Sequence, residues 1–125
     1  MAGSSKDLRK VLDKARALYE DRPDWWSQGV YGKTQRGHEI FSPEVLLTMG
    51  QRGEIPWCLC AVGMLYFAAG QCFPKSDDGK AESMAIEAVL RCGEKVSMRF
   101  FYTWNDEVGR NVKDVTNLFN SVART

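Results

Sequence analysis

The segment from Trp104 to Arg110 is the part of this chain best equipped for chemistry. It places an indole, an amide, two carboxylates and a guanidinium close together, in the order Trp-Asn-Asp-Glu-Val-Gly-Arg. In a functional interpretation, Asp106 and Arg110 orient a polar ligand or a partner over the ring of Trp104. In a structural interpretation, which we favour, Asn105 and Asp106 bond backbone donors of their own turn, Gly109 takes a positive φ and Arg110 pairs with a carboxylate.

Cys58 and Cys60 offer a second kind of chemistry, nucleophilic attack by a thiolate. We expect both in the first turn of a helix, where unpaired N–H groups and the helix dipole favour the ionised thiol. A thiol enzyme also needs a base. The candidates are Asp106 and the single histidine, His38, which falls beside a turn. We therefore keep a thiol enzyme as an alternative, with packing as the favoured role of both cysteines.

The spacing of the four cysteines argues against a metal site. Cys58-x-Cys60, followed by Cys72 and Cys92, matches no paired zinc-binding pattern. On one helix Cys58 and Cys60 would point about 200° apart. The chain also lacks a phosphate-binding loop, a dinucleotide fingerprint and a nucleophile elbow. We expect no metal, no cofactor and reduced thiols.

Composition narrows the class of protein and partner. The chain has 125 residues, of which 44% are hydrophobic, and 17 Lys+Arg against 16 Asp+Glu give a net charge of +1. This predicts one globular domain over 1–125 with no general attraction to nucleic acid. The N-terminus has no apolar signal segment, and the longest apolar stretch, 55–70, falls short of the roughly 20 residues that span a bilayer. We expect a cytoplasmic protein without membrane association.

Hydrophobic periodicity predicts a mainly α fold of the α+β type. Apolar residues recur at helical spacing near 8–19, 43–50, 81–92 and 112–122. We expect the first helix to have its N-cap at Ser4 or Ser5 and to stop at Pro23. The second should start at Ser42-Pro43 and end at Gly50 or Gly53. Gly93 is the expected C-cap of the third, and Asn111 with Asp114 is the expected capping box of the fourth.

Two further elements complete the predicted domain. Residues 25–41 read as a minor β-hairpin that turns at Gln35-Arg36-Gly37. The stretch from Trp57 to Ala69 has no charged side chain, so we expect a central helix buried on all sides by about four others. Gly63 would let another element approach its backbone. A loop through Pro74 and Asp77-Asp78-Gly79 follows this helix, and residues 96–102 remain unassigned.

Three short elements together carry a resemblance to a family. They are Trp26-Ser27-Gln28-Gly29, Cys58-Leu59-Cys60-Ala61-Val62-Gly63 and Trp104-Asn105-Asp106-x-x-Gly109-Arg110, the last followed by Val115 and Leu118-Phe119. In this order they resemble a family of short uncharacterised proteins from bacteria, mainly actinomycetes, and their phages. That family usually has tryptophan where this chain has Leu59, and residues 47–55 look like an insertion. The resemblance implies no established activity. It implies a phage or mobile-element origin, and we hypothesise that the three elements meet at the N-terminus of the central helix.

The leading functional hypothesis is a non-catalytic interaction or regulatory protein of unknown target. No complete catalytic set is visible, and Trp25, Trp26 and Tyr31 beside Arg36 are predicted to form an exposed binding patch. The partner would be a host or other cellular protein; the sequence indicates no oligomeric state. The alternatives are a small thiol-dependent hydrolase or transferase and a small polar-ligand-binding domain. The candidate binding residues are Trp26, Gln28, Trp104, Asn105, Asp106 and Arg110, and the catalytic candidates are Cys58, Cys60 and Asp106.

Overall fold

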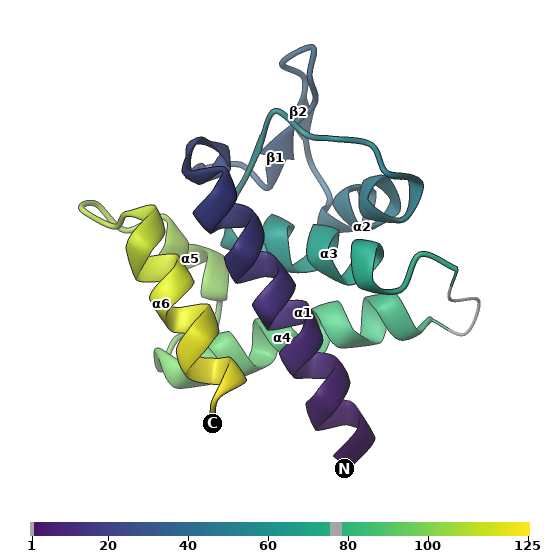
Figure 1. Ribbon diagram of the computed structural model, residues 1–125. Coiled ribbons are helices and arrows are strands. Elements are labelled where there is room, and N and C mark those ends of the chain that lie inside the picture. Colours follow the sequence, from purple (N-terminus) through teal and green to yellow (C-terminus); the bar gives the residue numbers. More distant parts are fainter. Residues whose placement is uncertain (1, 76–78) are drawn as a thin grey trace.

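A computed structural model of the chain describes residues 2–75 and 79–125 and has a mainly α architecture (Figure 1). This confirms the predicted fold class, including the minor β-hairpin. The elements of the described residues are α1 (Ala2–Asp21), the 3₁₀ turn η1 (Pro23–Trp25), β1 (Gly32–Lys33), β2 (Glu39–Ile40), α2 (Pro43–Arg52), β3 (Cys58–Leu59), α3 (Ala61–Cys72), α4 (Lys80–Lys95), α5 (Phe101–Asn105) and α6 (Val112–Ala123).

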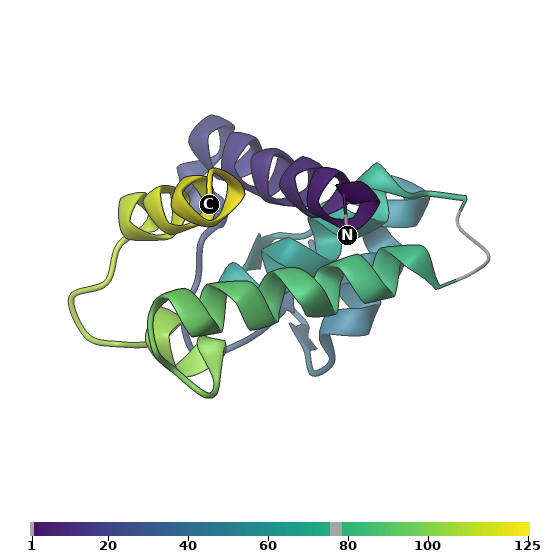
Figure 2. The same cartoon turned by 90° about the horizontal axis from the view of Figure 1, so that it is seen from below.

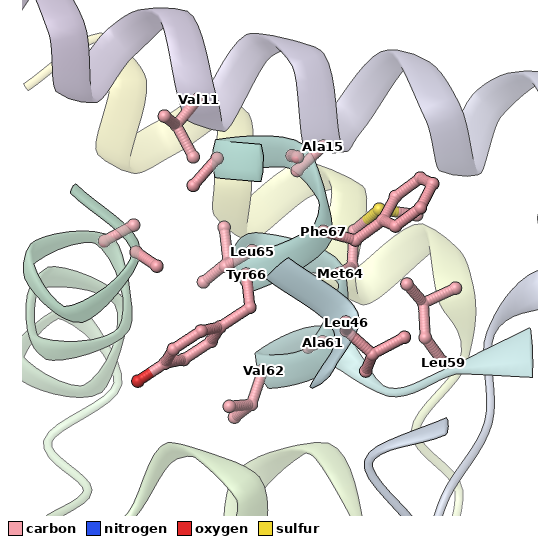
Figure 3. Packing of buried hydrophobic residues seen from close by; sticks show 14 of the residues in the cluster. Val11, Ala15, Leu46, Leu59, Ala61, Val62, Met64, Leu65, Tyr66 and Phe67 are labelled. Atoms are coloured by element: carbon pink, nitrogen blue, oxygen red, sulfur yellow. The ribbon is translucent and has the colours of Figure 1, made fainter. Parts of the chain in front are cut away.

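Helix α3 is the centre of the hydrophobic core. Every residue from Ala61 to Gly70 is buried, and helices α1, α2, α4 and α5 all contact α3. An uncharged helix tolerates this position because it has no polar face to hydrate. In Figure 3, Val11 of α1 and Leu46 of α2 reach α3 from different sides. The prediction of a central helix surrounded by others is confirmed.

Helix α2 crosses α3 with the two backbones in close contact. A Cβ atom at Gly50 would overlap the carbonyl oxygen of Phe67, and one at Gly70 would overlap that of Leu47. Gly50 therefore serves the crossing and does not end α2. The helix ends at Gly53, which takes the left-handed conformation with φ of 73°, so the second of the two expected ends is correct.

Helices α1 and α6 lie side by side, and α4 lies on the opposite side of the core (Figure 2). The rings of Tyr19 on α1 and Phe119 on α6 stack with centroids 6.2 Å apart. Helix α6 starts with the predicted capping box: Asn111 Oδ1 accepts the backbone N–H of Asp114, and Asp114 Oδ2 accepts that of Asn111. The apolar stripes predicted for both helices face this interface and the core.

The small sheet has the strand order β2-β1-β3 and is antiparallel throughout. Gly32 of β1 pairs with Ile40 on one side and Leu59 on the other. The third strand corrects the sequence analysis, which placed Cys58 and Leu59 in the central helix. A wholly apolar run has no periodicity that separates strand from helix, and here the backbone N–H of Trp57 donates to the Lys33 carbonyl.

Several predicted helix boundaries were wrong. Helix α1 begins at Ala2, so Ser4 and Ser5 lie within it, and α4 continues through Gly93 to Lys95. The unassigned segment leads into α5, and residues 76–78 of the predicted loop lie outside the described residues. Within residues 2–75 and 79–125, no helix combines the length and apolar character needed to cross a membrane.

Candidate functional site

The side chain of Asn105 joins the three sequence elements. It is fully buried, and its Oδ1 accepts hydrogen bonds from Trp26 Nε1 at 2.7 Å and from the backbone N of Ala61 at 3.0 Å. Its Nδ2 donates to the Ser27 carbonyl and to Asp106 Oδ1, both at 3.0 Å. All four hydrogen-bonding positions of the amide are therefore used. The predicted meeting of the elements is confirmed, and we call Trp26, Ser27, Ala61, Asn105 and Asp106 the Asn105 cluster.

The N-terminus of α3 owes its position to this cluster. The bond from Ala61 satisfies an N–H group that a helix leaves without an internal partner. Cys60 is the N-cap, and its sulfur accepts from the backbone N of Gly63 at 3.4 Å. A Cβ atom at Gly63 would overlap the carbonyl oxygen of Tyr31. The glycine thus allows the predicted close approach, here by the chain that enters β1.

Two long side chains hold the C-terminal end of α5. Gln28 Nε2 donates to the carbonyl oxygens of Asn105 and Glu107, both at 2.9 Å. Arg110 Nε donates to the Trp104 carbonyl at 3.1 Å, and its guanidinium carbon lies 3.9 Å from the Trp104 ring centroid. These contacts bond carbonyl groups in the last turn of α5 and just beyond it, where a helix leaves carbonyls without intrahelical partners. Gln28 and Arg110 therefore act within the protein.

The structural interpretation of the 104–110 segment is confirmed at two positions and corrected at two others. Gly109 has a φ of 88°, and Arg110 forms an ion pair with Glu107 at 2.8 Å, as predicted. Asn105 and Asp106, however, bond backbone groups far away in sequence instead of donors in their own turn; Asp106 Oδ1 accepts the N–H of Gly29 at 2.9 Å. The segment therefore links distant parts of the chain.

The two cysteines of the middle element do not share a helical turn. Cys58 lies in β3 and Cys60 precedes α3. Burial raises the pKa of Cys60 to about 11, with a further contribution from the charge of Asp106, and this outweighs the hydrogen bonds from backbone N–H groups. His38 lies exposed beside the hairpin turn. The helix start therefore does not supply a thiolate near neutral pH.

Cys60 and Cys92 are expected to resist alkylation in the folded protein at pH 8. Burial raises the pKa of both thiols, and with a pKa near 11 only about one thiol in a thousand is ionised at pH 8. Mass spectrometry after iodoacetamide treatment, with and without urea, should find both residues modified only after unfolding. Modification of native Cys60 faster than that of free cysteine would contradict this account and support a thiol enzyme.

The predicted aromatic patch is wrong at Trp25. This side chain is buried, with 6% of its surface exposed, and its ring meets that of Phe67 edge to face at 6.1 Å between centroids. Trp26 and Tyr31 are half-buried, and Trp26 belongs to the Asn105 cluster. An apolar residue next to the end of a helix gives no indication from sequence alone whether it faces the core or the solvent.

An open pocket of about 300 Å³ lies beside the Asn105 cluster. Two of the predicted site residues line it, namely Asp106 and Cys60. Tyr31 of the predicted aromatic patch lines it as well. Sequence reasoning missed Glu39, Phe41 and Tyr102, although the alternation of Glu39, Ile40 and Phe41 places the first and third on the same face of a strand. Phe41 is 80% exposed, which is unusual for this residue type. The lining consists of Gly29, Val30, Tyr31, Glu39, Phe41, Cys60, Tyr102 and Asp106.

The structure brings together some candidate residues and separates others. Trp26, Gln28, Asn105 and Asp106 are joined by hydrogen bonds, while Trp104 and Arg110, the first and last residues of the segment, contact each other. Within the part of the chain that the structure describes, no group of three or more His, Cys, Asp or Glu side chains is placed to hold a metal ion.

One comparison with known proteins finds a match. The model of a family described as "Family of unknown function (DUF6197)" matches residues 4–125. Neither the curated proteins nor the solved structures contain a match to the chain.

Proposed function

The chain belongs to DUF6197, a family of unknown function, and from that premise we propose that it is a non-catalytic binding protein whose contact surface is the pocket beside the Asn105 cluster. The partner is a protein of the cell in which the chain acts, and the site of action is the cytoplasm. If the phage or mobile-element origin implied by the sequence resemblance holds, that partner is a protein of the host.

The observation that carries this proposal is that the Asn105 cluster is bonded internally, whereas the adjoining pocket, which shares Asp106 with it, exposes aromatic rings. The polar atoms of Asn105 are all used within the protein. The pocket beside them presents the ring of Phe41, 80% exposed, and that of Tyr102, 45% exposed. Exposed aromatic side chains around a concave surface are typical of binding sites. The cluster supports the scaffold, and the pocket is the surface left for a partner.

The alternatives have less support. A thiol enzyme would use Cys60, which lines the pocket, but its sulfur is buried and burial raises its pKa to about 11. A polar-ligand site built on Trp104, Asn105 and Arg110 would compete with the internal hydrogen bonds of these residues. Asp106 is the one member of that predicted set that also lines the pocket.

Affinity capture with matched surface variants tests the proposal. The tagged protein and a Phe41→Ser, Tyr102→Ser double variant are incubated with lysate of the organism that encodes the chain, and retained proteins are quantified by mass spectrometry. Val108→Ser is the control, because Val108 is fully exposed and lies outside the pocket lining. One protein retained by the wild type and the control but lost with the double variant is the expected result. Equal retention by all three, or retention of nothing by the wild type, would contradict the proposal.

A further inference from the structure

We propose that the pocket beside the Asn105 cluster binds the cationic group of an arginine or lysine side chain presented by the partner protein. This inference rests on the proposed function and adds the chemical class of the group that enters the pocket. It depends on the charges of the lining, on the aromatic rings of the lining and on the exposed apolar surface next to the pocket.

The charged groups that line the pocket are both carboxylates, those of Glu39 and Asp106, and no Lys, Arg or His belongs to the lining. Asp106 Oδ1 accepts from Gly29 and Asn105, whereas its Oδ2 has no hydrogen bond within the described residues. The carboxylate of Glu39 is likewise without one in the same part of the chain. An anion would be repelled here, and an uncharged apolar group would remove water from both carboxylates without replacing its hydrogen bonds.

Three aromatic rings complete the match to a cation. Tyr31, Phe41 and Tyr102 all line the pocket, and the face of an aromatic ring attracts a guanidinium or ammonium group within about 6 Å. The same pairing occurs next to the pocket, where the guanidinium carbon of Arg99 lies 5.4 Å from the centroid of Phe100. A basic side chain from outside would therefore meet ring faces and carboxylate oxygens together.

The surface next to the pocket favours a side chain on a protein over a free small cation. The rings of Phe100 and Tyr102 pack together with centroids 5.7 Å apart, and both are about half exposed. A partner protein would cover this apolar surface with the residues next to its basic side chain, which adds contact area that a small ion cannot supply.

Lys33 offers a test of whether the group that enters the pocket is positively charged. It pairs with Glu39 across the β-hairpin, so the two side chains share a face of the sheet, yet no ion pair within 4.0 Å joins them. Its positive charge weakens the attraction of Glu39 for another cation. Removing the charge of Lys33 should therefore strengthen binding of a basic side chain, while removing that of Glu39 should weaken it.

The experiment is an NMR titration of the ¹⁵N-labelled full chain with two peptides, acetyl-Ala-Arg-Ala-amide and the same peptide with neutral citrulline in place of arginine. We expect the arginine peptide to shift the backbone amide signals of Gly29, Glu39 and Tyr102. We also expect it to bind at least about fivefold more tightly than the citrulline peptide. Glu39→Gln should weaken binding by about fivefold and Lys33→Gln should strengthen it. The control Glu54→Gln changes an exposed carboxylate outside the lining and should leave the affinity unchanged.

Each outcome decides the inference separately from the proposed function. Equal binding of the arginine and citrulline peptides, or the absence of shifts at the pocket amides with both, would overturn it. Methylguanidinium, which carries the same single charge without the peptide, serves as a third ligand: binding as tight as that of the peptide would overturn the assignment to a protein side chain. The capture experiment above tests the proposed function independently, because it reads loss of a partner whatever the charge of the group that enters the pocket.

Discussion

Replacement of Asn105 by alanine is expected to lower the free energy of unfolding by about 3–5 kcal/mol. The substitution removes four hydrogen bonds and leaves the buried N–H of Ala61 and the part-buried indole N–H of Trp26 without an acceptor. An unpaired buried donor costs more than the net value of the bond that it has lost. Because these bonds hold the N-terminus of α3, the loss is expected to affect the whole core.

Urea unfolding followed by circular dichroism measures this effect as a lower midpoint at an unchanged slope. Asn117→Ala on the exposed face of α6 is the matched control and should change stability little. Asn105→Asp keeps the acceptor atoms, loses the donors and buries a carboxylate beside Asp106. Since burial raises the pKa of such a carboxyl, the loss of stability relative to the wild type should grow as the pH rises above about 4. An Asn105→Ala variant as stable as the Asn117→Ala control would contradict the structural role of the cluster.

The Gly63→Ala variant is expected to show the second largest loss, about 3 kcal/mol. A single methyl group at this position would overlap the carbonyl oxygen of Tyr31 and approach the side chain of Leu46. The carbonyl belongs to the backbone between the Asn105 cluster and β1, so the conflict cannot be relieved by a change of rotamer. The same substitution at a solvent-exposed helix position would stabilise the helix, because alanine has the higher helix propensity.

Gly93→Ala is the control for this prediction. Gly93 also lies within a helix, but the nearest atom to its added Cβ is the Met98 carbonyl oxygen at 3.0 Å, so a much smaller shift relieves the contact than at Gly63. Thermal unfolding should place Gly63→Ala well below both the wild type and Gly93→Ala. Equal midpoints for the two variants would show that the approach of Tyr31 to α3 is not as close as described.

Local signals in the sequence predicted most of the helices. The stripe that includes Val11, Leu12 and Tyr19 buries one face of α1, and the Asn111–Asp114 pair caps α6 as expected. These signals depend on residues within one or two turns of each other, so a single sequence contains them. The uncharged stretch in the middle predicted the central helix for a similar reason, because charge is absent from every side of it.

The features that the sequence analysis misplaced depend on contacts between residues far apart in the sequence. Cys58 and Leu59 form a strand because β1 lies beside them, and nothing within the run 57–69 indicates where strand ends and helix begins. Asn105 was expected to bond backbone donors of its own turn, but three of the four partners of its amide lie 44 to 79 positions away. The pocket as a whole was missed because the neighbouring residues Glu39 and Phe41 lie far in sequence from Tyr102, which completes the lining. The hypothesis that the three sequence elements meet and the expected close approach at Gly63 supplied the information about tertiary contacts that could be obtained from the sequence.

Hydrogen exchange of the Trp26 indole N–H tests the central claim of this account most directly. That group donates at 2.7 Å to the buried amide of Asn105, whereas the side chain of Trp57 is 59% exposed and provides an internal reference. NMR in deuterated solvent, with the indole signals assigned by Trp26→Phe and Trp57→Phe, should show slow exchange at Trp26 and fast exchange at Trp57. Exchange at Trp26 as fast as at Trp57 would contradict the joining of the three elements at Asn105.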